Sequence, residues 1–599
     1  MGTLIIVSTE EEARTALSLV GNNRFPRSFG RGSLIFAQNK IYLAISLEAE
    51  FYLEKNIPGW KNPLYKFISK DGYSGGAKYF IDNFKIVYSE LGNEYYKYVR
   101  DRIGFFLQDF ERSYDFGEKV INYFKPKKII TFGLEDYPGY SINNGTLIPH
   151  AFFLLSRKKN IKYRKISINS RREFKLRQSV GNIYKFLNGL KRNKIRNGKI
   201  LMLIPPSKFL EMEEFISDIK KSGLDVIFLT YGLTFSQRKV LKSFTCEFWE
   251  KERLYDKEIW EESKIIESHL IKEHAWNKFS HPRFDEDKFA SKFIKAKISQ
   301  VIRNEFREIG ADIILARKII TGSGINLLVT FTDPDTKCLT FISGAKEAGV
   351  ETISIEHGGS LAPIPYPLPL SNKHILWSKK TSELFFSNFY TNDGRPLGKK
   401  KVLIGESPFD TNIEVNSKSQ KPDKIKILFL ATIHYFDPGL TIYWEKRLFS
   451  LLLNSDINVE ISIRLHPFQN RRNFTALVNK YPQKCKFSDF NSLNEALKDA
   501  DVIIFENTTA GVYSLLSGKP TVFFNPYNKT DMFGVGKFDR SFSVLSENDL
   551  QLGLVAFLKE TRLDFVSRDK IRFAKEYFGK GNVRKLNKLI NILRTYENK

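Results

Sequence analysis

The feature that most constrains this chain is a recurring order of short apolar strand, turn rich in Gly, Pro or Asp, helical segment and next strand. The order occurs in three stretches, which begin at KKIITFGLEDYPG (127–139), GKILMLIPP (198–206) and KIKILFLATI (424–433). Strands that read as continuous apolar runs between helical segments are typical of parallel sheets covered on both faces. The sequence therefore predicts an α/β protein built from three units.

A chain of 599 residues is too long for a single hydrophobic core, so several domains are expected. Polar segments near 170–197 and 391–423 favour domain boundaries at these positions. The expected organisation is an N-terminal α/β domain of unassigned role (1–190), a Rossmann-like domain (195–395) with a helical insertion (248–308), and a C-terminal Rossmann-like domain (400–599). Near the C-terminus, Phe573, Tyr577 and Phe578, then Leu586, Ile590 and Leu593, fall at helical spacing. This spacing favours core packing, with a membrane-surface helix as the alternative.

The chain is strongly basic, with 94 Lys and Arg against 67 Asp and Glu and a formal net charge of +27. The basic residues are spread through every segment, and no zinc-finger, RRM or KH pattern accompanies them. Abundant Lys, Ile, Asn and Phe together indicate an AT-rich genome, which raises the Lys content without selection for a ligand. The open alternatives are a basic surface facing anionic lipid or an anionic substrate and a nucleic-acid surface. We expect no nucleic-acid partner.

Several classes of protein and site are disfavoured by simple patterns. No apolar run reaches the ~18–20 residues that span a bilayer, and the start MGTLIIVSTEEEA reads as a strand rather than a signal peptide. Cys246, Cys338 and Cys485 neither cluster nor provide a disulfide framework, which favours the cytoplasm. The three histidines His269, His274 and His281 do not share a helical face. We therefore expect no metal site.

The stretch 459–526 carries the candidate chemistry. Arg464, His466 and Pro467 follow an apolar strand, and ligands bind at the carboxyl ends of strands in open α/β sheets. Arginine and histidine side chains at such an edge suit a phosphate group.

A second strand of this stretch, 500–506, ends in Glu506. Asn507, Thr508 and Thr509 follow and lead into a helix, so hydroxyls and backbone N–H groups come together near its start. A role of Thr508 or Thr509 as a simple helix N-cap is the alternative. Lys519 precedes the next strand and completes the basic part of the pattern.

The order Arg-x-His-Pro, hydroxyl pair and Gly-Lys-Pro resembles the C-terminal half of GT-B glycosyltransferases that use cytidine-nucleotide donors. These include bacterial sialyl- and polysialyltransferases, capsule Kdo transferases and CDP-glycerol glycerophosphotransferases. The resemblance covers about 330–600 and implies two Rossmann-like domains facing a cleft. It implies that His466, Thr508 and Thr509 contact the donor phosphate and that Glu506 contacts the ribose or the base. His434, in the loop after strand 424–433, is a further expected donor contact.

The general base has several candidates. The strand VETISIEHGG (350–359) ends in His357, and the resemblance implies a base at this position that faces the donor. Asp333 and Asp335 are read as an N-cap and turn, as catalytic carboxylates or as a metal site. The pair Glu135 and Asp136 resembles an acidic motif in the N-terminal half of GT-B sialyltransferases.

These patterns together predict a metal-independent glycosyltransferase. The expected reaction moves a sugar, of nonulosonic-acid or Kdo type, from a CMP donor to a surface glycan. The alternatives are a CDP-polyol phosphotransferase, a UDP-sugar epimerase-like enzyme, and a non-catalytic basic protein that binds membranes or nucleic acid. The expected partners are a CMP- or CDP-linked donor as co-substrate, with no other cofactor, and a glycan or lipid-linked glycan acceptor. Peripheral contact with the anionic inner membrane is also expected.

Overall fold

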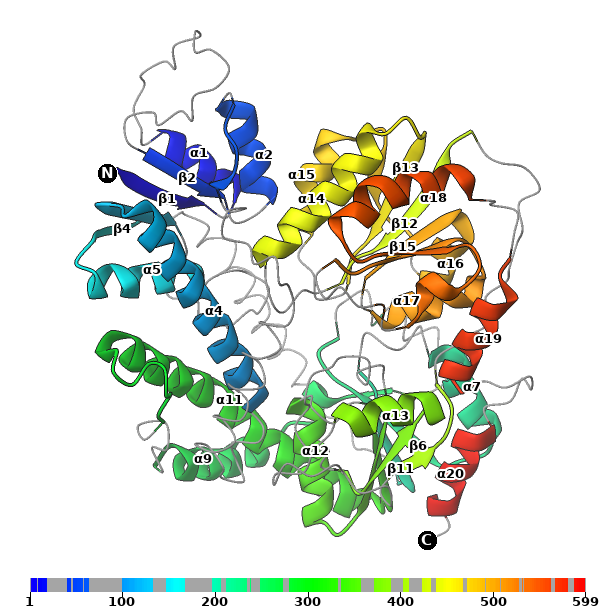
Figure 1. Cartoon of the computed structure of the whole chain (residues 1–599). Helices are drawn as coiled ribbons and strands as arrows, with labels where there is room; N and C mark the ends of the chain where they lie inside the picture. The colour runs from blue at the N-terminus through cyan, green and yellow to red at the C-terminus, as the bar shows by residue number, and fades with distance from the viewer. Residues whose placement is uncertain are drawn as a thin grey trace.

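The computed structural model describes the greater part of the chain. The described residues are 2–7, 9–18, 40–44, 47–57, 59–63, 100–132, 147–166, 197–205, 212–233, 238, 248–272, 279–331, 336–356, 371–388, 402–408, 423–432, 438–466, 471–490, 492–506, 508–526, 531, 533–561, 566–579 and 587–597. These residues form three sheets whose strands pair in parallel (Figure 1). The predicted α/β class is confirmed.

The N-terminal sheet has four strands in the order β2-β1-β3-β4. Its strands are β1 (Thr3–Val7), β2 (Lys40–Ala44), β3 (Lys128–Phe132) and β4 (Lys162–Ile166), and its helices are α1 (Glu10–Ser18), α2 (Leu47–Asn56), α4 (Arg100–Phe124) and α5 (Leu147–Lys158). Separate hydrophobic clusters pack on its two faces, as expected for a sheet covered on both sides.

The middle sheet has seven strands in the order β11-β10-β9-β8-β5-β6-β7. Its strands are β5 (Ile200–Leu203), β6 (Val226–Thr230), β7 (Phe248–Glu250), β8 (Leu327–Thr330), β9 (Glu351–Ile355), β10 (Lys373–Leu376) and β11 (Val402–Ile404). Its helices are α7 (Glu213–Lys221), α9 (Lys257–Lys272), α11 (Lys288–Ser323), α12 (Thr336–Glu347) and α13 (Lys379–Asn388), with a 3-10 turn at Lys251–Arg253. The chain first runs outward from β5 and then continues from β8 on the other side, which is the Rossmann-like order.

The predicted helical insertion 248–308 needs correction at both ends. It begins with the edge strand β7, which pairs with β6, and the long helix α11 continues to Ser323. A three-residue strand is too short to show periodicity, so the surrounding helical pattern concealed it.

The C-terminal sheet has six strands in the order β14-β13-β12-β15-β16-β17. Its strands are β12 (Ile425–Leu430), β13 (Val459–Arg464), β14 (Cys485–Phe487), β15 (Val502–Phe505), β16 (Thr521–Phe524) and β17 (Ser541–Val544). Its helices are α14 (Pro438–Asn454), α15 (Arg472–Lys480), α16 (Leu493–Asp499), α17 (Thr509–Ser514), α18 (Leu554–Glu560) and α19 (Arg568–Tyr577), with short helical turns at Leu515–Ser517, Val535–Lys537 and Asp549–Gly553. Two Rossmann-like sheets and an additional N-terminal α/β unit agree with the predicted fold class.

The last helix, α20 (Asn587–Glu597), packs on the middle sheet rather than on the C-terminal one. The amide of Asp225 donates to Glu597 Oε1 at 2.7 Å, and Lys373 Nζ donates to Tyr596 Oη at 2.5 Å. Ile590 and Leu593 are buried in the shared core, which confirms core packing for this helix. Since α20 and β11 both belong to the middle sheet, the predicted C-terminal range 400–599 includes two segments of its neighbour.

The C-terminal and middle units approach each other very closely at Gly579, which follows α19. Its φ is +70°, and a Cβ atom there would lie 1.8 Å from the carbonyl oxygen of Trp377. The amide of Ser407 donates to the Phe578 carbonyl oxygen at 2.8 Å, and the rings of Trp377 and Phe578 lie 5.3 Å apart. Only glycine fits this position, because any side chain would collide with backbone.

The N-terminal unit contacts both of the other units. Its helix α2 packs on α15, and Lys446 of α14 binds Glu50 Oε1 at 2.5 Å and Glu54 Oε1 at 2.6 Å. Its helices α4 and α5 share a hydrophobic cluster with α11 of the middle unit. In Figure 1, α4 runs down the molecule from the N-terminal sheet towards α11. The N-terminal unit therefore joins the other two.

No helix among the described residues is long and apolar enough to cross a membrane. Cys338 and Cys485 are buried and carry free thiols, whereas Cys246 lies outside the described residues.

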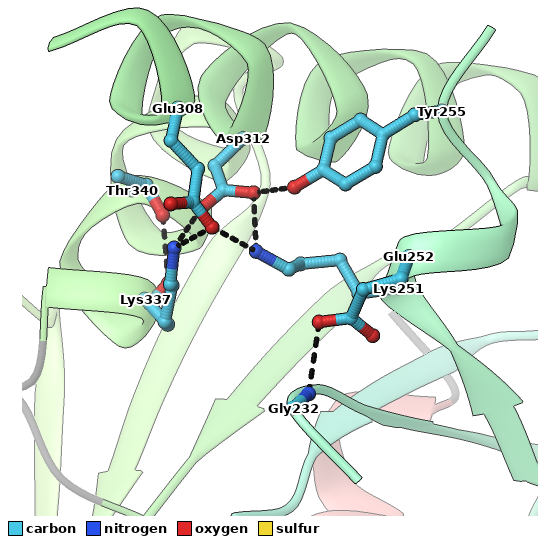
Figure 2. A network of polar contacts seen from close by, with 8 residues as sticks. All are labelled: Gly232, Lys251, Glu252, Tyr255, Glu308, Asp312, Lys337 and Thr340. Carbon is cyan, nitrogen blue, oxygen red and sulfur yellow. Dashed lines mark hydrogen bonds and ion pairs between the residues drawn. The ribbon is translucent and has the colours of Figure 1, made fainter. Parts of the chain in front are cut away.

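A buried polar network joins three segments of the middle unit (Figure 2). Asp312 of α11 is fully buried and accepts a bond from Lys251 Nζ at 2.7 Å and another from the hydroxyl of Tyr255. Lys337 of α12 lies 3.3 Å from the second Asp312 oxygen and 2.5 Å from Glu308. Burial alone would lower the pKa of Lys337, but the charges of Asp312 and Glu308 outweigh it and raise that pKa. Asp312 and Glu308 together balance the charges of Lys251 and Lys337.

We expect Asp312→Ala to destabilise the protein by about 3–5 kcal/mol, because it leaves the buried Lys251 ammonium without its closest countercharge. The measurement is the midpoint of urea unfolding, with Glu262→Gln as the control. Glu262 binds Arg317 at the surface, so that control should cost about 1 kcal/mol or less. Combining Asp312→Leu with Lys251→Met should recover much of the loss. Equal costs for Asp312→Ala and the control would contradict this account.

Candidate functional site

The C-terminal sheet has its topological switch point between β12 and β15. The chain passes from β12 to β13 and β14 on one side and resumes at β15 on the other. Leu430 is in register with Arg464 on one neighbour and with Phe505 on the other, so three strands end at one level. In sheets of this order ligands bind outside the carboxyl ends of the strands at the switch point. Of the predicted residues, Arg464 is the last residue of β13, and His466, Glu506, Thr508 and Thr509 follow strands that end here.

Glu506 connects the two strands at the switch point. Its carboxylate accepts a hydrogen bond from the backbone amide of Thr432, which follows β12, at 2.9 Å. The side chain is 1% exposed. The bond fixes the start of the loop after β12, so Glu506 has a structural role here, and its predicted contact with ribose or base stays a prediction.

A second buried carboxyl group faces Glu506 from α14. Glu445 is 2% exposed, and its Oε1 has no hydrogen-bond partner among the described residues. Burial, and then the charge of Glu506, raise the pKa of Glu445 well above its ordinary value. The raised pKa favours the protonated form of Glu445, because two ionised carboxylates held close together repel each other.

No local sequence pattern points to Glu445, because it is one charged residue in an amphipathic helix. Its neighbour Lys446 binds Glu50 and Glu54 of the N-terminal unit. Helix α14 therefore places Glu445 beside Glu506 at the switch point and the next residue, Lys446, against α2.

Arg464 and His466 are half-buried at the end of β13. Arg464 Nη1 donates to the carbonyl oxygen of Phe490 at 3.0 Å, which directs the guanidinium towards the segment after β14. The amide of Ala431 donates to the Arg464 carbonyl oxygen at 3.0 Å and continues the ladder to the strand end. The structure thus brings both residues to the predicted edge, with the arginine on the β14 side of it.

Thr508 is the N-cap of α17. Its backbone is extended, and its Oγ1 accepts a bond from the Ala510 amide at 3.4 Å. The N-cap reading of Thr508 is therefore correct. A hydroxyl that accepts such a bond still has its own hydrogen to donate, so the predicted phosphate contact is compatible with the cap.

Gly511 explains why the helix starts so close to the strand. A Cβ atom at Gly511 would lie 1.8 Å from the ring of Phe505, the last residue of β15. Only a hydrogen atom fits between this helix and this strand. Sequence reasoning missed Gly511, although the Ala-Gly after the threonine pair was a readable signal.

The predicted donor contact of Lys519 is wrong. Its Nζ donates to the carbonyl oxygens of Leu497, Lys498 and Ala500, at 2.8, 2.9 and 2.6 Å. These carbonyls end α16, and Lys519 precedes β16, so both lie at the amino edge of the parallel sheet. This edge is opposite to the switch-point ligand site. Lys519 caps a helix C-terminus, where a cation is favourable.

Many predicted residues lie outside the described residues. These are the predicted bases His357, Asp333, Asp335, Glu135 and Asp136, and the predicted donor contacts Pro467, Asn507 and His434. Among the described residues no group of three or more His, Cys, Asp and Glu side chains is arranged to hold a metal ion. Of the three histidines weighed for zinc, His281 is buried with its ring 4.9 Å from Phe284, while the His274 position and the His269 side chain are not described.

A further unusual acid, Glu356, lies at the carboxyl end of β9 in the middle sheet. Its Oε2 accepts a bond from the Trp377 amide at 3.1 Å, and the Trp377 indole donates to the Glu356 carbonyl oxygen at 2.8 Å. Its Oε1 is buried without a partner among the described residues, as is the hydroxyl of Tyr577 from α19. Burial raises the pKa of Glu356 to about 7, and hydrogen bonds from the Trp377 amide and the Thr381 side chain only partly offset this effect.

Glu356 was missed although it directly precedes the predicted base His357. The sequence shows only a strand that ends in an acidic residue. The raised pKa arises because residues far apart in the chain, from β10 and α19, bury the carboxyl group. No local pattern encodes that burial.

No protein-family model matches the chain, and neither does any curated protein sequence. Several solved structures are similar in fold. UDP-GlcNAc 2-epimerase from Neisseria meningitidis, bound to UDP-GlcNAc, is 10% identical with a TM-score of 0.41 and covers 66% of this chain and 99% of its own. MurG from Acinetobacter baumannii is 10% identical with a TM-score of 0.34 and covers 66% and 99%.

A third similar structure is Anabaena Alr3699/HepE in complex with UDP and glucose. It is 12% identical with a TM-score of 0.39 and covers 67% of this chain and 100% of its own. At TM-scores below 0.5 these similarities do not indicate a function for this chain.

Unfolding at different pH values tests the state of Glu356. Between pH 4.5 and about 7 the native carboxyl group holds its proton more tightly than the unfolded one, so the free energy of unfolding falls as pH rises through this window. Glu356→Gln carries no titrating proton. Relative to wild type, we expect the variant to gain stability between pH 5 and pH 8, by up to about 3 kcal/mol.

The measurement is the urea midpoint of wild type and Glu356→Gln at both pH values. Glu383→Gln is the matched control, because Glu383 is exposed on the neighbouring helix α13. The control should follow the wild type at both pH values. A Glu356→Gln variant that also follows the wild type would show that the buried carboxyl group is ionised throughout.

Proposed function

We propose that this chain is a glycosyltransferase whose nucleotide-sugar donor binds at the carboxyl edge of the C-terminal sheet, between β12 and β15. The observation that carries the proposal is the convergence of sequence motif and topology. Arg464 and His466 follow one strand and Thr508 and Thr509 another, and both strands end beside the switch point. The motif was recognised from residue types alone, while the switch point follows from strand order.

The chemistry of sugar transfer fits these side chains. As the glycosidic bond to the nucleotide breaks, negative charge grows on the departing phosphate, and the transition state is stabilised by donors already in place. Arg464, His466 and the hydroxyl of Thr508 are donors of this kind. The raised pKa of Glu445 also helps, because protonation of this carboxyl group removes negative charge that would repel the phosphate.

The second requirement is a base that takes the proton of the acceptor hydroxyl. We assign this role to His357, which follows the end of β9, with Asp333, Asp335 and the pair Glu135 and Asp136 as the alternatives. The finer part of the proposal is a cytidine donor carrying a nonulosonic-acid or Kdo-type sugar, a glycan or lipid-linked acceptor, and no further cofactor. The support for this part is the motif resemblance alone.

Two other enzymes share parts of the motif. A CDP-polyol phosphotransferase would release CMP while transferring a polyol phosphate, and a UDP-sugar epimerase-like enzyme also carries Arg-x-His-Pro before a Gly-Lys-Pro strand. Stabilisation by CMP is expected of both the sugar transferase and the phosphotransferase, stabilisation by a CDP-polyol only of the phosphotransferase, and stabilisation by UDP of the epimerase-like enzyme. A non-catalytic protein on this scaffold predicts no stabilisation by any nucleotide.

Thermal unfolding with a panel of CMP, CDP, UMP and UDP tests the proposal. A ligand at one hundred times its dissociation constant stabilises the native state by about 2.7 kcal/mol, so we expect a clear rise in Tm with cytidine nucleotides. His466→Ala and Thr508→Val should lose this rise, and His466→Ala should also abolish sugar transfer, because each removes a donor to the phosphate.

The control for the panel is His150→Ala. His150 lies on α5 of the N-terminal unit, with its ring 5.1 Å from Phe293, far from the switch point in sequence and topology. This variant should keep the full nucleotide response. A response that survives His466→Ala and Thr508→Val together would place the nucleotide elsewhere and overturn the assignment.

A further inference from the structure

The N-terminal unit has a local concentration of positive charge. The two ranges 119–132 and 147–166 contain ten Lys and Arg residues and no Asp or Glu, although the whole chain has 67 acidic residues against 94 basic ones. The ten are Lys119, Lys125, Lys127, Lys128, Arg157, Lys158, Lys159, Lys162, Arg164 and Lys165. Uniform lysine enrichment does not explain a region without any acid.

These basic residues gather at one end of the fold. Eight of them lie near the ends of α4 and α5 and at or before the starts of β3 and β4, which is the amino edge of the parallel sheet, whereas Arg164 and Lys165 lie further along β4. Lys159 Nζ donates to Asn122 Oδ1 at 3.0 Å and brings the end of α5 beside the end of α4. The amide of Lys162 donates to the Lys127 carbonyl oxygen at 3.3 Å and joins the starts of the two strands.

Two large aromatic side chains are exposed on the same two helices. Tyr123, near the end of α4, is 55% exposed, and Phe153 of α5 is 36% exposed. We call the surface formed by Tyr123, Lys125, Lys127, Phe153, Lys159 and Lys162 the basic face; its four lysines are all exposed. Lys158 is not part of it, because its ammonium lies 3.6 Å from Asp287.

The combination of lysines and exposed aromatic rings suits the surface of an anionic bilayer. Lysine clusters are attracted to anionic headgroups, and aromatic rings are favoured at the level where headgroups meet acyl chains. Nucleic acid fits less well, because the guanidinium of Arg157 lies over the Phe153 ring at 5.5 Å and the Tyr163 ring meets it at 5.2 Å. A ring contacted in this way has little free face on which a base can stack.

We propose that the basic face docks this protein on anionic lipid bilayers, with the lysines at the headgroups and Tyr123 and Phe153 in the interfacial layer. In Figure 1, β4 and α5 lie at the margin of the molecule remote from the six-stranded sheet. Docking through this face leaves the switch point between β12 and β15 uncovered. The inference does not depend on the proposed enzymatic activity.

Vesicle co-sedimentation of the full chain tests the proposal. The probes are vesicles of phosphatidylcholine alone and vesicles of phosphatidylcholine mixed with phosphatidylglycerol. We expect binding to the anionic vesicles only, and weaker binding as salt is raised. Replacing Lys125, Lys127, Lys159 and Lys162 together by Gln should weaken binding about a hundredfold or more, because each lysine near such a surface contributes about a fivefold gain.

Two further variants make the test specific to this face. Replacing Lys346, Lys498, Lys575 and Lys588 by Gln removes the same charge from exposed positions elsewhere and should leave binding within about twofold of wild type. Tyr123→Ser with Phe153→Ser should weaken binding about tenfold or more at unchanged charge. Equal losses in the two lysine variants, equal binding to neutral vesicles, or binding of a single-stranded RNA in place of vesicles would each overturn the proposal.

Discussion

The relative placement of the two Rossmann-like sheets depends on the contact between Gly579 and the backbone of Trp377. The chain leaves α19 of the C-terminal unit there and returns to the middle sheet, and the approach is closer than any side chain would allow. Trp377 also binds Glu356, and Tyr577 and Phe578 pack on its ring, so the crossing buries one ionisable group and several aromatic rings together. The raised pKa of Glu356 is a consequence of this packing. Glu356 is therefore an ionisable group buried where the two sheets meet, and ionisation of its carboxyl group is unfavourable there. It directly precedes the predicted base His357.

The N-terminal unit also helps to fix the relative placement of the two Rossmann-like sheets. Its helix α2 binds Lys446 through Glu50 and Glu54, while α4 and α5 pack on α11 of the middle unit. Any change in the angle between the two larger sheets therefore has to deform or release one of these two contacts. Glu50 is fully buried, so separating it from Lys446 would leave a buried carboxylate without this countercharge, which is costly. The position of α14, and with it of Glu445 at the switch point, is thus tied to the N-terminal unit.

The sequence predicted what depends on local order and strand direction. Apolar runs identified the parallel strands, and their carboxyl ends placed Arg464, His466, Thr508 and Thr509 at one edge, because all strands of the sheet run the same way. The predicted donor contact of Lys519 failed by the same rule, because Lys519 precedes a strand. It therefore lies at the other edge of the sheet, where it binds the end of α16. Glu445 and Glu356 were unpredictable for a different reason. Their protonation depends on burial by segments tens to hundreds of residues away, and β7 was missed because three residues show no period.

The distribution of charge between sheet edges gives the overall +27 a more specific meaning. At the switch point of the C-terminal sheet Glu445 and Glu506 are buried, and burial and then the charge of Glu506 raise the pKa of Glu445. At the amino edge of the same sheet the buried ammonium of Lys519 is compensated by backbone carbonyls rather than by acids. The amino edge of the N-terminal sheet differs from both, because the four lysines of the basic face are exposed and no acid occurs along 119–132 and 147–166. Composition raises the lysine content everywhere, but it cannot remove acids from one edge alone. The positive charge of the lysines at this edge, which no neighbouring acid in the two ranges balances, is therefore more informative about a binding surface than the net charge of the whole chain.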